Sequence, residues 1–323
     1  MDRTNYIIKR LLSLVPVFLG VTLVVFLLVR LTPGDPVTAM IPPQARTPET
    51  VEALRNRLGL DDPLPVQYFN WVTDAMMLDL GTSYSQDRPV TAVIASHIWP
   101  TVQISLVAFI VSIVIALPLG VLAGVYKDSW IDQLSRVIAF TGISIPSFWL
   151  GLMTIMFGAL FWNRWFGYTL IPAGGYVSPT ESVQLWLWHV LPPGIILGIG
   201  FSAITMRLTR SSMAEAMQED YIRTARAKGA KEQLVIIVHA LRNALIPVVT
   251  VAGLQVGYLL NGAVVVEEVF AWPGVGRLLF QAVQMQDMPL IQGLVLLFAT
   301  VFVVMNLVVD MLYTVLDPRI EYE

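Results

Sequence analysis

The sequence predicts an all-α membrane protein with six transmembrane helices and a small helical subdomain outside the membrane. Hydrophobic residues make up 56% of the 323 residues and charged residues only 13%. The mean hydropathy is +0.69. Apolar runs reach about 20 residues, the length that a helix needs to cross about 30 Å of hydrocarbon. These runs are continuous, whereas the strands of a membrane barrel alternate over about ten residues.

The apolar runs define the six predicted spans. The basic N-terminus resembles a signal peptide, but the first run is too long for one and no small-x-small cleavage site follows, so we interpret it as an uncleaved anchor. The fourth span is the least regular because Pro192, Pro193 and three glycines interrupt it. The spans are Leu11–Val29, Pro100–Tyr126, Val137–Trp162, Val190–Met206, Leu245–Val266 and Leu290–Leu312.

These spans divide the chain into three parts. Residues 1–30 form the N-terminal tail and first helix, residues 31–98 an extracytoplasmic subdomain, and residues 99–323 a five-helix core with a polar loop at 207–243. With a cytoplasmic N-terminus, the inside segments hold thirteen Lys/Arg and the outside segments six. The positive-inside rule therefore predicts that both termini are cytoplasmic.

The predicted subdomain has the signals of two short helices. Thr47 followed by Pro48 is typical of a helix cap with proline at the first position, and this helix is expected to end at Gly59. A second helix contains Tyr68, Phe69 and Trp71 and is expected to lie near the membrane surface. Acids outnumber bases eight to four over residues 31–98.

The most unusual feature of the apolar chain is the segment Glu215–Lys231, called here the polar segment. Glu219 and Asp220 precede a predicted helix Tyr221–Lys228, where acids favour the N-terminal dipole. Gly229 follows as a helix stop. Two interpretations are open on physical grounds: a short rigid helix presented to a partner protein, or a basic loop that touches only lipid headgroups.

The polar segment resembles the cytoplasmic coupling loop of permease subunits of binding-protein-dependent ABC importers. Their broad signature is E-A-A-x3-G-x9-I-x-L-P, and Ala225, Gly229 and Leu241 match it at the same spacing. The departures at Arg223 and Thr224 follow the wording of the first permease subunit of dipeptide, oligopeptide and nickel importers, E-D-Y-I-R-T-A-R-A-K-G. Other matching pieces are Thr32–Pro36, Asp79–Ser83, Ser144–Phe148, Arg207–Met213, Phe270–Gly276 and Asp317–Arg319.

The resemblance implies a type I ABC importer permease fold in a bacterial inner membrane. Two permeases, usually different chains, form the pore, and each lays its coupling helix in a groove of one of two cytoplasmic ATPase subunits. A binding protein delivers the solute from outside. The docking residues that the resemblance implies are Glu219, Asp220, Tyr221, Thr224, Ala225, Lys228 and Gly229.

Polar residues at membrane depth are candidates for a pore lining. Gln255, Tyr258 and Asn261 recur at i, i+3 and i+6 on the fifth span, and Ser144 and Ser147 flank a predicted Pro146 kink in the third. The alternative in both places is close packing with interhelical hydrogen bonds. Likewise, Glu267 and Glu268 are expected either to meet a cationic solute or binding protein, or to lie in a solvated loop.

Several classes of function are excluded or disfavoured. The chain lacks cysteine and any G-x-x-x-x-G-K-[ST] phosphate loop, so we expect no enzyme, no cofactor and ATP hydrolysis on separate chains. His97, His189 and His239 lie apart and predict no metal site. The sequence suggests no nucleic-acid partner.

The cargo remains open. Di- or oligopeptides are the main expectation, with glutathione or a nickel chelate as alternatives in the same class. A stand-alone secondary transporter is the runner-up, but such carriers more often have membrane-embedded carboxylates.

Overall fold

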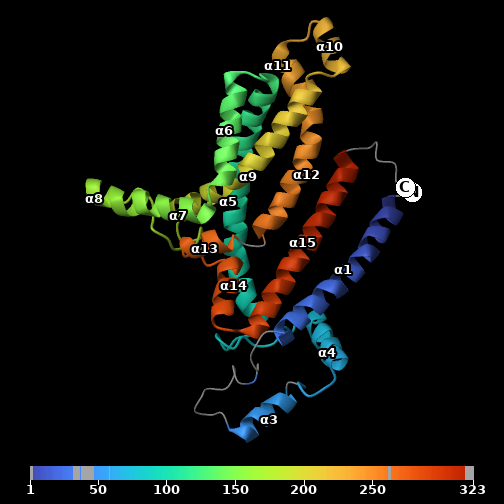
Figure 1. Cartoon of the computed structure of the whole chain (residues 1–323), viewed down its shortest axis with the longest axis vertical. Helices are drawn as coiled ribbons and strands as arrows, with labels where there is room; N and C mark the ends of the chain where they lie inside the picture. Colours follow the sequence, from blue (N-terminus) through green and yellow to red (C-terminus); the bar gives the residue numbers. More distant parts are fainter. Residues whose placement is uncertain (1–2, 32–36, 38–46, 58, 261–262, 317–323) are drawn as a thin grey trace. The chain divides into compact units, whose positions relative to one another are not determined.

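The computed structural model describes residues 3–31, 37, 47–57, 59–260 and 263–316 (Figure 1). Within these ranges the regular structure is helical, apart from one isolated bridge between Thr82 and Pro89. The helices are α1 Arg3–Leu31, α3 Pro48–Arg57, α4 Leu64–Met76, α5 Val90–Val125, α6 Trp130–Ser144, α7 Ser147–Ile155, η2 Met156–Phe161, α8 Trp162–Phe166, α9 Val183–Ala216, α10 Asp220–Ala227, α11 Glu232–Leu234, η3 Val235–Ala240, α12 Leu241–Leu260, α13 Val264–Val269, α14 Val275–Gln284 and α15 Met288–Leu316.

Four continuous helices of the described residues are long and apolar enough to cross a membrane. They are Val90–Val125, Val183–Ala216, Glu232–Leu260 and Met288–Met311, and they match the second, fourth, fifth and sixth predicted spans. The first predicted span lies in α1, whose described apolar section is Leu12–Leu27. The all-α class is confirmed.

The third predicted span, Val137–Trp162, is not one straight helix. The helices α6 and α7 meet at a bend of 90°, so the pair counts as one broken span or as a re-entrant segment. The physical cause is Pro146, which has no N–H to donate and disfavours helical geometry in the residue before it. Accordingly, Ile145 is extended, with φ −86° and ψ 121°.

The fifth predicted span, Leu245–Val266, also has different bounds. Its helix begins earlier, because α11, η3 and α12 run on continuously from Glu232, and α12 ends at Leu260. A separate helix, α13, begins at Val264 after the non-helical Ala263. Residues 263–266 are again apolar, which is why the sequence placed the end of the span too late.

By its internal contacts the chain forms two compact units, described separately here. Of the described residues, unit 1 comprises those up to residue 99 and 274–303, and unit 2 comprises those in 100–273 and 304–316. In unit 1, α4 packs against α1: the Phe26 ring lies 5.5 Å from Tyr68 and 6.2 Å from Trp71. The Thr22 and Tyr68 hydroxyls are 2.8 Å apart. These contacts place the aromatic helix predicted from the sequence against the first apolar helix.

The predicted start of the first subdomain helix is confirmed. Pro48 is the first residue of α3, and the Thr50 backbone N–H donates to the Thr47 hydroxyl at 3.2 Å, as an N-terminal cap requires. The described part of this helix ends at Arg57, two residues before the expected Gly59.

Unit 1 has its own core where α5 begins. Val90, Val93 and Ile94 pack against α14 and the first turns of α15. Beside this core, the buried Asp287 accepts hydrogen bonds from the Ser83 hydroxyl at 2.6 Å and from the Ser85 N–H and hydroxyl at 2.9 and 2.7 Å. Asp287 also accepts from the Leu290 N–H at 3.3 Å and so caps α15.

In unit 2, α9 lies between α5, α6 and α12 (Figure 1). The backbones of α5 and α9 approach closely: a Cβ added at Gly124 would lie 2.5 Å from that of Met213. At the other end of α5, the fully buried Trp272 donates from its indole nitrogen to the Pro100 carbonyl at 2.9 Å. That bond satisfies the one polar group of the largest buried side chain.

We predict that Asp287→Asn lowers the free energy of unfolding by about 1–3 kcal/mol, because charge-assisted hydrogen bonds to a buried carboxylate are lost. Burial by itself raises the pKa of Asp287, but the bonds from Ser83, Ser85 and the Tyr84 backbone outweigh it and lower the pKa. This contribution is therefore complete above the ordinary value of 3.8 and is lost as pH falls through the lowered value.

The measurement is thermal unfolding of the full chain in detergent at several pH values. Asp74→Asn, an exposed carboxylate in α4, is the matched control and should change stability by less than about 0.5 kcal/mol. An equal midpoint for wild type and Asp287→Asn at neutral pH would contradict the prediction.

Candidate functional site

The polar segment forms a short helix, α10, at one end of unit 2, beyond the ends of α9 and α12 (Figure 1). The expected helix Tyr221–Lys228 is present one residue earlier, at Asp220–Ala227, with Lys228 as its C-terminal cap. Gly229 has φ +79°, a left-handed conformation that favours glycine. The predicted helix stop at Gly229 is confirmed.

The end of α10 is a Schellman motif. The Ala230 N–H donates to the Ala225 carbonyl at 3.2 Å, and the Gly229 N–H donates to the Arg226 carbonyl at 2.9 Å. Both bonds satisfy carbonyls that a helix end leaves without partners. Ala225 and Ala230 also pack against one apolar cluster, which contains residues of α9 and η3. The turn after α10 is thus fixed by backbone geometry that Gly229 allows.

One side chain anchors α10 to the rest of unit 2. Ile222 is fully buried, in a cluster with Met213 and Ala216 of α9 and Val235 and Ala240 of η3. A fully buried isoleucine contributes about 1.5–3 kcal/mol of transfer free energy. Most other residues of the helix are exposed, and Ala225 is only half-buried, so burial of Ile222 is the main contact that holds α10.

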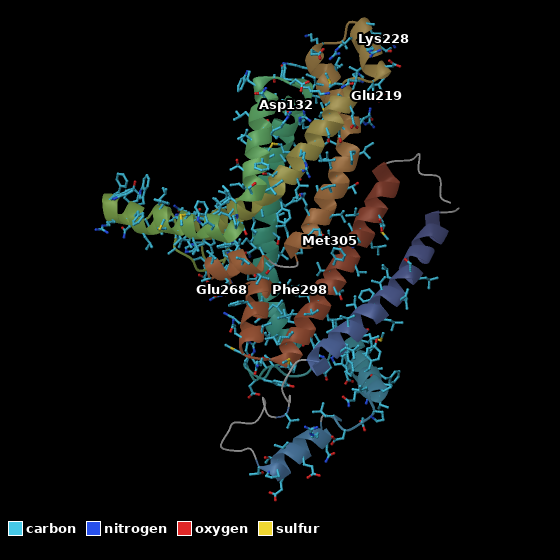
Figure 2. All side chains as sticks on the ribbon, viewed as in Figure 1. Asp132, Glu219, Lys228, Glu268, Phe298 and Met305 are labelled. Carbon is cyan, nitrogen blue, oxygen red and sulfur yellow. The ribbon has the colours of Figure 1, made fainter. Side chains whose placement is uncertain are left out.

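The docking residues that the resemblance implied lie mostly on the surface. Ala225 is half-buried, and Tyr221 exposes 38% of its surface. Figure 2 shows Glu219 and Lys228 at the two ends of α10. The exposed members are Glu219, Asp220, Tyr221, Thr224, Lys228 and Gly229. The structure therefore gathers them on one short helix and its cap, accessible to another molecule.

Polar contacts within the loop set its shape. Arg226 donates from Nη2 and Nε to Glu232 at 2.6 and 3.1 Å, which joins α10 to α11. The Thr224 hydroxyl donates to the Asp220 carbonyl at 2.9 Å, and Arg223 pairs loosely with Asp220 at 3.4 Å. Exposed pairs of this kind contribute little to stability, so burial of Ile222 is the main restraint.

A buried charge cluster at the same end of unit 2 was missed in the sequence. Asp132, near the start of α6, is completely buried and accepts from Arg210 of α9 at 2.6 and 2.8 Å, and from Arg136. Figure 2 shows Asp132 at the end of unit 2 that also holds Glu219 and Lys228. The i, i+4 spacing of Asp132 and Arg136 is visible in the sequence, but the partner 78 residues away is not.

The pore candidates of α12 have different surroundings. Gln255 is buried; its Oε1 accepts from the Thr205 hydroxyl at 3.0 Å and its Nε2 donates to the Phe201 carbonyl at 3.3 Å, both on α9. For Gln255 these bonds match the alternative to a pore lining, namely close packing with interhelical hydrogen bonds. Tyr258 exposes 59% of its surface. Asn261 lies outside the described residues.

The candidates of the third span lie at the 90° bend. Ser144 is the last residue of α6 and is exposed, and Ser147 is the first residue of α7 and is half-buried.

The pair Glu267–Glu268 is not a solvated loop. Glu267 lies in α13, is completely buried and accepts from the Thr101 hydroxyl at 2.9 Å, while Glu268 is half-buried. The alternative of a solvated pair is therefore wrong for Glu267. Two adjacent glutamates after an apolar run do not by themselves predict a second helix, and α13 was therefore not expected from the sequence.

The part of the chain that the structure describes contains no group of three His, Cys, Asp or Glu side chains placed to hold a metal ion. The ring nitrogens of His97 and His189 lie within hydrogen-bond distance of the carbonyls one turn earlier, at 2.8 and 2.7 Å. Both histidine rings therefore make contacts within their own helices.

Unit 2 thus consists of long apolar helices with a short polar helix at one end. Residues 116–322 match the family described as binding-protein-dependent transport system inner membrane component, and residues 3–107 match the N-terminal region of such components. The chain therefore belongs to the family of inner membrane components of binding-protein-dependent transport systems.

Similar proteins of full length support this assignment. The glutathione transport system permease protein GsiC of Pectobacterium atrosepticum is 43% identical over 321 residues, which cover 99% of each chain. GsiC of Escherichia coli K12 is 42% identical over 319 residues with the same coverage. A solved structure of the MetNI methionine ABC transporter is similar in fold, with a TM-score of 0.53 at 20% identity, over 70% of this chain and 96% of that one.

The chain is thus a multi-pass inner-membrane permease component of an ABC importer. Permeases of this family work with a second permease, ATPases and a substrate-binding protein. The type I importer permease fold expected from the resemblance is confirmed. The cytoplasmic location of the two termini stays a prediction from Lys/Arg counting.

We predict that Ile222→Ala loosens α10, because the substitution leaves a cavity in the cluster and typically costs about 2–5 kcal/mol. Trypsin should then cleave after Arg223 and Arg226 at least about tenfold faster in the full-length protein in detergent, since cleavage needs local opening. Thr224→Ala, on the exposed side of α10, is the control and should cleave at nearly the wild-type rate. Equal rates for Ile222→Ala and wild type would show that Ile222 does not hold the helix.

Proposed function

We propose that α10 with its cap is the coupling helix of this permease, docking on a cytoplasmic ATPase through Glu219, Asp220, Tyr221, Thr224, Ala225, Lys228 and Gly229. The observation that supports this most directly is the combination of one buried anchor, Ile222, with an exposed outer face. A helix anchored mainly by Ile222 in a cluster shared with α9 and η3 can transmit a movement imposed by a partner protein to both long helices. A loop that only met lipid headgroups would need no such anchor.

In this proposal ATP is hydrolysed on separate ATPase subunits, and closure of those subunits moves α10. The predicted orientation, in which the polar loop 207–243 faces inward, would place α10 in the cytoplasm. The part at 31–98 would face outward and meet the binding protein. Its helix α4 is exposed at Phe69 and Met76, which leaves apolar surface for such a contact.

For the pore, we propose Tyr258, Ser144 and Ser147 as lining candidates because each leaves polar surface accessible within unit 2. Gln255 and Asn261 complete the stripe expected from the sequence. Gln255 is the weakest member, since its amide already bonds to α9 at both ends.

For the solute we propose a small peptide, with glutathione as the first candidate. The support is the similarity to permeases named for glutathione transport, at 43% identity over 99% of each chain. Longer peptides and nickel chelates are the other candidates of the same class.

The solute is tested by uptake into proteoliposomes that contain the chain with its own second permease, ATPases and binding protein. We expect ATP-dependent uptake of labelled glutathione and competition by short peptides. Uptake of a nickel chelate with none of glutathione would overturn the peptide assignment. Uptake driven by an ion gradient with this chain alone would favour a secondary transporter.

The coupling role is tested by Gly229→Asp. We predict that this variant inserts normally but loses at least about 90% of ATP-driven uptake, because a charged side chain then occupies the surface that the ATPase approaches. Space is not limiting within the chain itself, since a Cβ at Gly229 meets nothing within 4 Å. The left-handed φ of +79° adds only about 1 kcal/mol of backbone strain.

Gly167→Asp is the matched control. Gly167 has φ +77°, equally open space and an exposed position after α8, so the same strain and charge are introduced away from α10. We expect this control to keep most of its uptake. Normal uptake by Gly229→Asp, or equal loss in both variants, would argue against coupling through α10.

A further inference from the structure

Unit 2 has an open pocket between α6 and α9, at the end that also holds α10. Its floor is apolar and consists of Ala139, Phe140 and Ile143 of α6 and Met206 of α9. Phe140 and Ile143 expose 74% and 52% of their surface. The pocket volume is about 170 Å³, below the about 300–1,000 Å³ of a typical small-molecule site. The pocket therefore suits a segment of an apolar chain and not a whole solute.

The rim of the pocket is cationic. Arg136, Arg207 and Arg210 all line it. Arg210 and Arg136 share the buried Asp132, and Arg136 also reaches the exposed Asp128 at 3.4 Å. Arg207 is exposed, and its guanidinium has no hydrogen-bond or ion-pair partner among the described residues. Three guanidinium groups thus face two carboxylates, one of which is only loosely paired, and the rim keeps excess positive charge.

We propose that this pocket binds an anionic phospholipid, with the phosphate at Arg207 and Arg136 and part of one acyl chain on the apolar floor. The floor and rim together match a ligand that is apolar at one end and negatively charged at the other. A guanidinium binds phosphate through paired hydrogen bonds, and the guanidinium donors of Arg207 are not used by any described residue. Basic pockets between membrane helices are known sites for anionic headgroups.

The position of the pocket agrees with this ligand. Arg207 and Arg210 follow the apolar part of α9 and precede the polar segment, which is where the headgroup layer of a membrane is expected. A chain that belongs to an inner-membrane family is surrounded by such lipids. The proposal needs no assumption about the solute or about coupling through α10.

The test compares phosphatidylglycerol and phosphatidylcholine with identical acyl chains on the purified full-length protein, by native mass spectrometry. We expect phosphatidylglycerol to be retained at least about tenfold better. Arg207→Gln should reduce that preference about fivefold, as expected for one basic residue at a headgroup. Arg136→Gln combined with it should remove most of the remainder. Arg210 is left unchanged because its loss would leave Asp132 buried without its main partner.

Two matched controls separate a pocket from general surface effects. Arg242→Gln removes an exposed arginine of α12 outside the pocket and should leave the lipid preference unchanged. Phe140→Ala should weaken retention of both lipids, whereas Leu134→Ala, also exposed on α6 but outside the pocket, should not.

Four outcomes would overturn the proposal. Equal retention of the two lipids would exclude a headgroup site, and an equal effect of Arg242→Gln and Arg207→Gln would indicate diffuse surface charge. Displacement of phosphatidylglycerol by millimolar inorganic phosphate would indicate a site for a free anion. A dimer of the chain that dissociates on Arg207→Gln would assign the pocket to an interface between two copies.

Discussion

The packing of α9 against its neighbours is the constraint on which the rest of unit 2 depends. Gly124 lets α5 approach α9 so closely that a Cβ there would overlap Met213. Asp132 of α6 holds Arg210 of α9 in a bidentate ion pair. Gln255 of α12 bonds to α9 through both amide atoms. Each contact uses a different physical interaction: close backbone approach, a buried charge pair, and paired amide hydrogen bonds.

Because α9 is fixed on three sides, the segment that follows it has a defined starting point. The chain leaves α9 at Ala216, forms α10 and returns through η3 into α12. Ile222 holds this loop against the helices by packing against residues from both α9 and η3. The loop is therefore polar on its outer side and apolar at one point of its inner side. This arrangement suits a contact that must transmit movement, since α10 and the ends of two long helices share one small cluster.

The sequence predicted much of this site because its signals are local. Acids before a helix and a glycine after it are readable within the eleven residues 219–229, and the structure has α10 within one residue of the expected bounds. The third span and the end of the fifth were less predictable. Pro146 signalled a kink, but only backbone geometry shows that it reaches 90°. The polar cluster around Asp132 depends on a partner 78 residues away, which no local pattern encodes.

By itself the sequence determined the helical membrane class, the number and rough position of the apolar runs, and the family to which the chain belongs. The class and the apolar runs follow from composition and spacing, because hydrocarbon admits only chains whose backbone polar groups bond internally. The family follows from the resemblance of the motifs around the polar segment. Only the tertiary structure decided which polar residues in and beside those runs are buried and which are exposed. Gln255 and Glu267 are buried and bonded, Tyr258 is exposed, and Arg207 lines a pocket with no partner for its guanidinium among the described residues. Burial depends on which helix faces lie together, and residues far apart in the sequence form those faces.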